Sequence, residues 1–257
     1  MKKHKNTSKT LLLFLTALLI FVFTSPDLSA QKRKKEKQVE HLVFQTNPNG
    51  EGIEMSIEFT KGSSHNHPLM AIWVEDMDGN YIQTLYVAQS IAKGYFAYGD
   101  KSTGRWMAGE ISRPASLPYW AHKRNVKNDI GNYMPKPGFE VADAYSGATP
   151  KGNFNLNTRT DKMISGKFRV LMEINQTWDW NKHWTNSKYP DEPDYKTSSQ
   201  PALVYAAEID TDSTQKEFPL TVIGRSHHSG ADGKLYNDLN TITTALEIVS
   251  EIKVILK

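Results

Sequence analysis

Residues 69–88 read LMAIWVE, DMDGN and YIQTLYVA, which are two apolar runs on either side of a short polar segment. Apolar runs of this length with β-branched and aromatic residues are typical of β-strands. The polar segment 76–80 holds the Gly and Asn that a tight hairpin turn needs for positive φ. This stretch therefore predicts a β-hairpin, and it decides the fold class.

Similar patterns continue on both sides of the hairpin. Ile53, Met55, Ile57 and Phe59 alternate with polar residues, as expected for a half-buried strand. Further strands are predicted at 153–158, 167–177, 201–210, 218–224 and 250–256. Strands at this spacing predict an all-β, immunoglobulin-like β-sandwich.

Helix is expected to be scarce. One short helix is predicted at 243–249, capped by a threonine or by Asn240, and another turn or two around Pro114, Pro118 and Trp120. Two long polar insertions, 90–138 and 179–200, exceed ordinary sandwich loops, and functional residues often lie in such loops.

The N-terminus has the pattern of a secretory signal peptide. Lysines crowd the first nine residues, residues 11–23 are apolar apart from Thr16, and Ala30 ends a small-residue cleavage pattern. We predict a signal peptide at 1–30, a basic flexible tether at 31–38 and a single β-sandwich domain at 39–257. The alternative for residues 1–30 is an uncleaved N-terminal membrane anchor. The alternative for the basic tether is a segment that binds anionic lipid headgroups. The predicted location is periplasmic or otherwise exported, with no membrane span after cleavage.

The charge and cysteine content narrow the classes of function. The formal net charge is +3, but the excess lies in the predicted leader and tether, so the folded part is slightly acidic. This argues against a nucleic-acid-binding surface. The chain contains no cysteine, which rules out disulfides and thiolate chemistry.

One short string carries a specific chemical suggestion. Residues 143–149 read DAYSGAT. They resemble the pattern that bacterial FAD:protein FMN transferases recognise when they attach FMN through its phosphate to a Ser or Thr hydroxyl. By this resemblance Thr149 is the acceptor and Asp143 a recognition carboxylate, while the small Ser146, Gly147 and Ala148 leave room for the transferase. The alternative is a structural corner that ends a strand, with Pro150 restraining Thr149 to extended geometry.

A wider resemblance involves motifs along most of the predicted domain. The chain resembles a bacterial family of predicted periplasmic proteins of unknown function, found beside PepSY membrane proteins and flavin transferases and partly similar to the immunoglobulin-like domain of flagellar hook-capping proteins. This resemblance implies a β-sandwich near envelope redox systems, with a flavin transferase and a membrane redox protein as partners. The motifs are HPLMAIWVED (67–76), GNYIQTLYV (79–87), RPASLPYW (113–120), SGATP (146–150), QPALVY (200–205) and TTA (243–245).

Two other groups of side chains suggest binding. Trp178, Trp180 and Trp184 lie in one polar loop, where they would stack on a sugar, a flavin or a partner protein, or else fold back over the end of the sandwich. Two histidine pairs would form a zinc or copper site if their loops met, although exposed loop histidines are the simpler interpretation. A calcium site in the following acidic loop has less support because prolines interrupt it. The histidines are His65, His67, His227 and His228, and the acidic residues are Asp191, Glu192 and Asp194.

No motif of a known enzyme class occurs in the sequence. We therefore expect a non-enzymatic exported protein associated with flavin-dependent electron transfer, with FMN on Thr149. The alternatives are a cofactor-free module that docks a partner protein or glycan through the tryptophan loop, and a metal-dependent hydrolase.

Overall fold

The computed structural model describes residues 41–97, 107–109, 111–135 and 144–257. The chain divides into two units, Met1–Gln38 and Val39–Lys257, and all described residues belong to the second. The predicted signal peptide and tether lie outside the described residues, as does Asp143. Within the described residues, no helix has the length and apolar character needed to cross a membrane.

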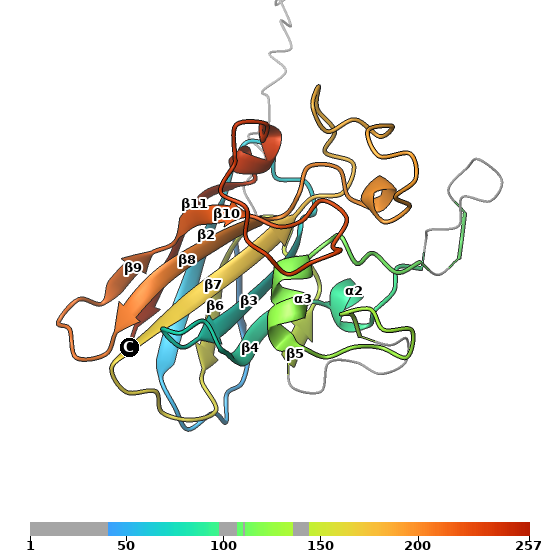
Figure 1. Cartoon of the computed structure of the whole chain (residues 1–257). Helices are drawn as coiled ribbons and strands as arrows, with labels where there is room; N and C mark the ends of the chain where they lie inside the picture. Colours follow the sequence, from blue (N-terminus) through green and yellow to red (C-terminus); the bar gives the residue numbers. More distant parts are fainter. Residues whose placement is uncertain (1–40, 98–106, 110, 136–143) are drawn as a thin grey trace, which may run out of the picture. The chain divides into compact units, whose positions relative to one another are not determined.

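Two β-sheets form the fold, as Figure 1 shows. The first has the strand order β1-β6-β2-β11-β9, and the second has the order β10-β8-β7-β3-β4-β5. The all-β sandwich with little helix is confirmed, and its immunoglobulin-like character stays a prediction. The strands are β1 (His41–Gln45), β2 (Glu54–Lys61), β3 (Leu69–Glu75), β4 (Tyr81–Ala88), β5 (Ala144–Gly147), β6 (Asn153–Arg159), β7 (Lys167–Asn175), β8 (Leu203–Asp210), β9 (Glu217–Pro219), β10 (Thr221–Arg225) and β11 (Val249–Leu256).

The predicted hairpin is confirmed, because β3 and β4 pair antiparallel with the predicted bounds. Gly79 has a φ of 81°, and Asp76 accepts hydrogen bonds from the backbone and side chain of Asn80. The single strand predicted at 218–224 is wrong: β9 pairs with β11 in the first sheet and β10 with β8 in the second. Leu220 still donates to the Ile252 carbonyl of β11, and β10 begins at the next residue. Strand β1 was not predicted, whereas β5 agrees with the alternative interpretation of residues 143–149 as a strand end that runs into a corner.

The helical segments are short, as expected. They are α2 (Gln89–Ala92), α3 (Pro118–Arg124) and the 3₁₀ turns η1 (Tyr195–Thr197) and η2 (Thr244–Glu247). The cap predicted for the last helix is wrong, because no side chain caps η2. The hydroxyls of Thr243 and Thr244 instead bond Gln200 and Asp179, which fasten η2 to the loop before β8.

Apolar side chains fill the space between the two sheets, among them Ile57, Phe154 and Met172. A second apolar cluster covers the other face of the second sheet, where Ala71, Trp73 and Leu171 pack against α2, α3 and the segment before α3. Every residue of β3 is consequently buried. This explains why its sequence is continuously apolar rather than alternating.

A buried carboxylate attaches α3 to the sheet. Glu173 is completely buried in β7, and its carboxylate accepts hydrogen bonds from the backbone N–H groups of Tyr119 (3.2 Å) and Trp120 (2.7 Å). The hydroxyl of Ser226 donates to the same carboxylate. Leu117, at the N-cap position, has no side-chain oxygen to bond these N–H groups. Glu173 therefore caps α3 from a different part of the chain.

Burial raises the pKa of Glu173 to about 7 from its usual value of 4.5, although its three hydrogen bonds act in the opposite direction. The folded protein consequently holds this proton more tightly than the unfolded chain. The stabilisation is complete below about pH 4.5 and is lost as the pH rises through about 7.

We predict that Glu173→Gln flattens the pH dependence of stability. The wild type should lose about 3 kcal/mol of its free energy of unfolding between pH 4.5 and pH 8 relative to the variant, because only the wild type must release a buried proton. Urea unfolding of both proteins across this range measures the difference. Parallel curves for the two proteins would contradict the prediction.

Candidate functional site

The predicted FMN-acceptor string is residues 143–149, called the acceptor string below. Its described part, 144–149, lies at the outer edge of the second sheet. Strand β5 pairs in parallel with β4, bringing Ser146 opposite Val87 and Gly147 opposite Ala88. Ser146 and Ala148 are exposed, and Thr149 is partly exposed. The chain then turns at the buried Pro150 toward β6. Thr149 thus lies just beyond an edge strand, and part of the residue is accessible to solvent.

The backbone of this string is fixed by a tyrosine from β4. The Tyr86 hydroxyl lies 3.2 Å from the carbonyl oxygen of Gly147 and 3.1 Å from that of Ala148, and it donates to both. A Cβ atom on Gly147 would approach a ring carbon of Tyr86 to 3.2 Å. Glycine is therefore the residue that fits this close contact. The Thr149 side chain has no hydrogen-bond partner among the described residues.

The tryptophan loop lies at a different end of the sandwich from β5 (Figure 1). Trp184 is only 3% exposed, belongs to the main core and donates from its indole to Thr241. Trp180 packs against the same core. These two side chains fold back over the end of the sandwich, which was one of the two expected arrangements. Trp178 is 47% exposed, so it is the tryptophan of this loop available to a ligand.

Backbone strain accompanies the exposure of Trp178. Its φ is 70°, a left-handed conformation that is unusual for a bulky side chain. Its N–H bonds the carbonyl of Ser198, and the neighbouring Asp179 forms a β-bridge with Ser199, whose φ is 114°. A strained residue persists only where its surroundings hold it. The exposed indole is therefore presented on a rigid support.

The glycine-rich loop after β10 packs against the tryptophan loop. The His228 ring stacks on Tyr189 with centroids 4.0 Å apart, and its Nε2 lies 3.0 Å from a carboxylate oxygen of Glu192. The guanidinium of Arg225 lies 5.4 Å from the centre of the Trp184 ring. These contacts join two loops that are far apart in the sequence, and they give the histidine a structural role.

The two histidine pairs have different neighbours. His65 packs against Phe59, with ring centroids 5.8 Å apart. His227 and His228 pack on each other, and His228 also packs on Trp184 and Tyr189 of the tryptophan loop. The described part of the chain contains no group of three or more His, Asp or Glu side chains placed to hold a metal. In the acidic loop, Glu192 is engaged by His228. Neither the histidines nor the acidic loop gives the metal hypotheses geometric support.

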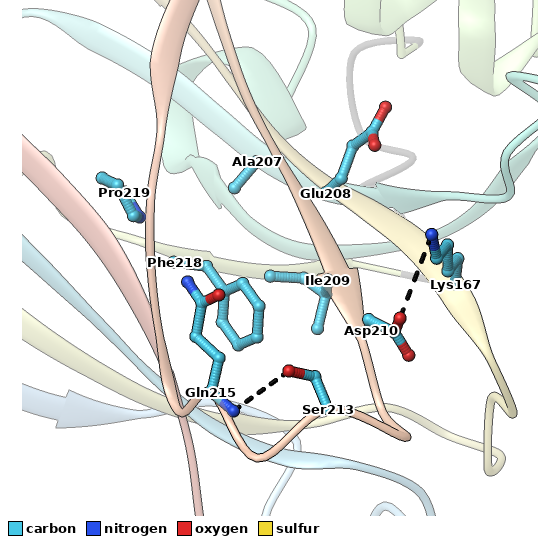
Figure 2. Close-up of a pocket in the computed structure, with 9 residues that line it drawn as sticks. All are labelled: Lys167, Ala207, Glu208, Ile209, Asp210, Ser213, Gln215, Phe218 and Pro219. Atoms are coloured by element: carbon cyan, nitrogen blue, oxygen red, sulfur yellow. Dashed lines mark hydrogen bonds and ion pairs between the residues drawn. The ribbon is translucent and has the colours of Figure 1, made fainter.

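A cavity of about 310 Å³ opens between β8 and β9, where β10 stops pairing with β8 at Ala206 (Figure 2). Phe218 and Ile209 form its apolar part, and the ion pair between Lys167 and Asp210 (4.0 Å) lies at its side. It contains neither a histidine nor a predicted site residue. Its position follows from the separation of the sheets at their open edge.

A smaller cavity of about 220 Å³ lies between α3 and the glycine-rich loop. His122 uses its Nδ1 to bond the Pro118 carbonyl at 2.7 Å, and its ring contacts Tyr133. Burial raises the pKa of the Asp194 carboxyl group, which also lines this cavity. His122 was not predicted as a candidate site residue, because a single histidine in a helix has no distinctive spacing.

No family model, curated protein or solved structure matches this chain. Its function must therefore be inferred from the residues and their geometry.

We predict that Tyr86→Phe loosens the acceptor string without disturbing the core. The loss of the hydroxyl should cost about 1 kcal/mol and leave two carbonyl groups without their donor. Hydrogen exchange of the amides at 144–149 should accelerate. Tyr205→Phe is the matched control, because Tyr205 is buried in the same core and its hydroxyl has no hydrogen bond within the described residues. Equal exchange in both variants would contradict the role of Tyr86.

Proposed function

We propose that this chain is an exported, non-enzymatic flavin carrier with FMN attached through its phosphate to the Thr149 hydroxyl, and that it serves electron transfer in the cell envelope. The observation that carries the proposal is the exposure of the acceptor string. Ser146 and Ala148 face solvent, and the partly exposed Thr149 follows them at the edge of the second sheet. A string of this composition used only as a corner would not need an accessible hydroxyl.

The attachment reaction uses FAD and a separate flavin transferase. The Thr149 oxygen attacks the phosphorus on the flavin side of the FAD pyrophosphate. A new P–O bond forms, the bond to the AMP phosphate breaks, and AMP leaves while the hydroxyl proton passes to a base of the transferase. The oxidation state of the flavin does not change. The carrier would then accept electrons from a membrane redox protein through the bound isoalloxazine ring.

The local geometry suits a tethered cofactor. Tyr86 holds the carbonyls of Gly147 and Ala148, and the buried Pro150 fixes the chain on the other side of Thr149. The attachment atom is therefore held in a constant position on the sheet edge. A cofactor bonded there stays with its protein during exchange of electrons and cannot diffuse away.

We predict that the mature chain, co-expressed with a flavin transferase, gains the mass of one FMN less one water. Thr149→Ala should abolish the gain because it removes the attacking oxygen, and Thr149→Ser should retain it because the hydroxyl remains. Intact-mass spectrometry and absorbance of the unfolded protein measure the attachment. An unmodified wild type, or full modification of Thr149→Ala, would overturn the proposal.

The exposure of Trp178 favours a second candidate function, in which the chain is a cofactor-free module that docks a partner protein or glycan. Its indole is solvent-accessible and the backbone beneath it is strained but firmly held. Pre-organised aromatic side chains are common anchors of interfaces because little entropy is lost on binding.

For this second function we predict that Trp178→Ala abolishes partner binding and costs less stability than Trp184→Ala, because Trp178 is 47% exposed and Trp184 only 3%. Trp184→Ala should instead destabilise the fold by about 3–5 kcal/mol because it empties a core site. Chemical unfolding and pull-down of bound envelope components measure the two effects. Retention of every captured component by Trp178→Ala would exclude this docking surface.

A further inference from the structure

Arg113 is a buried cation that has no anionic partner among the described residues. The residue is only 7% exposed, yet no salt bridge or side-chain hydrogen bond joins its guanidinium to another described residue. Its Nε is buried and has no acceptor. The Phe96 ring lies against the guanidinium, with its centre 4.2 Å from the guanidinium carbon.

Arg225 shows how this protein otherwise buries a guanidinium. It is 8% exposed, and it donates to the Asp238 carboxylate at 2.8 Å, to the Asp238 carbonyl at 3.1 Å and to the Ser226 carbonyl at 3.2 Å. Its charge is thus paired and its donors are used. The two arginines are equally buried, but the protein supplies acceptors to only one of them among the described residues.

The unpaired state is energetically unfavourable. A buried charge loses its hydration, and burial accordingly lowers the pKa of Arg113. Contact with an aromatic face returns only part of this loss. An oxyanion bound by the guanidinium would supply both the missing charge and the missing acceptors.

The turn that carries Arg113 has a second unsatisfied polar group. Ser116 is fully buried, its hydroxyl has no partner, and its N–H bonds the Arg113 carbonyl at 3.0 Å. The turn is held on both sides: Ser198 donates to the Ala115 carbonyl at 3.4 Å, and Gly230 is packed so closely that a Cβ there would lie 2.5 Å from the Pro114 carbonyl oxygen. The unsatisfied donors are therefore on a rigid segment.

We propose that Arg113 is the anchor of a binding site for a phosphate group. Arginine binds phosphate oxygens through paired N–H donors. The small exposed fraction of Arg113 limits the ligand to inorganic phosphate or to the terminal phosphate of a larger molecule. This site is separate from Thr149 and does not depend on the flavin proposal.

The first test compares the melting temperatures of two arginine variants with that of the wild type in chloride buffer without phosphate. Arg113→Met should leave the melting temperature unchanged or raise it, because an unpaired buried charge is replaced by an apolar side chain of similar length. Arg225→Met should lower it clearly, because the variant loses the three hydrogen bonds of the guanidinium and its contacts with the Trp184 and Tyr236 rings. A fall for Arg113→Met as large as that for Arg225→Met would overturn the proposal by showing that the chain's own acceptors already pair Arg113.

The second test is the response to inorganic phosphate at constant ionic strength, on Thr149→Ala protein so that no flavin phosphate is present. Phosphate at ten times its dissociation constant should raise the melting temperature by about 3–6 °C. Arg113→Met should abolish the rise, Arg113→Lys should weaken it, and Arg169→Met, which removes a partly exposed arginine, should retain it. Phosphate-induced stabilisation that survives Arg113→Met, or its absence from the parent protein, would reject the site. A glycerol-phosphate arm distinguishes a terminal phosphate from the free ion.

Discussion

The three hydrogen bonds accepted by Glu173 determine how the second sheet is covered. The carboxylate lies in β7, caps α3 through Tyr119 and Trp120, and receives the hydroxyl of Ser226 from the end of β10. One side chain thus joins three segments that are distant in the sequence. A carboxylate would ordinarily be costly at complete burial, but the positive end of a helix and three donors make it tolerable here.

The position of α3 has consequences for the rest of the second layer. With α3 against the sheet, Trp73 is fully buried, and its indole donates to Glu75 at 2.9 Å, a second buried carboxylate that Lys123 of α3 approaches to 3.7 Å. Glu75 and Glu173 are both completely buried on this covered face. The segment that leads into α3 is held at the same time, and it includes the turn with Arg113. The unsatisfied guanidinium is therefore built into the same layer that the buried carboxylates organise.

The sequence pattern predicted the strands well where the residues alternate or form apolar runs with clear turns. Residues 69–75 and 81–88 are examples, because their apolar side chains and the Gly79 turn act locally. The pattern failed at 217–225, where one run of residues contributes a strand to each sheet. This crossing depends on tertiary packing and has no local signal in the sequence. Strand β5 was foreseen only as an alternative for the 143–149 string, because pairing with β4 is what makes this small-residue segment a strand.

The candidate sites were less predictable than the fold. The acceptor string was visible as a motif, but the contact that requires Gly147 comes from Tyr86, 61 residues earlier. Trp178 and Trp184 lie in the same polar loop, so the sequence does not indicate which of them is exposed. Only the packing at the end of the sandwich makes Trp184 a core residue and leaves Trp178 at the surface. A signal for Glu75 and Glu173 did exist, since Glu75 ends the apolar run 69–74 and Glu173 interrupts the apolar run 170–174.

The acceptor string shows how structural and chemical roles divide within one motif. Gly147 is explained by packing, because its backbone lies against the Tyr86 ring, and Pro150 is explained by the corner between β5 and β6. Packing does not explain Thr149, whose side chain is partly exposed and has no hydrogen-bond partner among the described residues. The contacts of the described residues therefore assign the Thr149 hydroxyl no structural role.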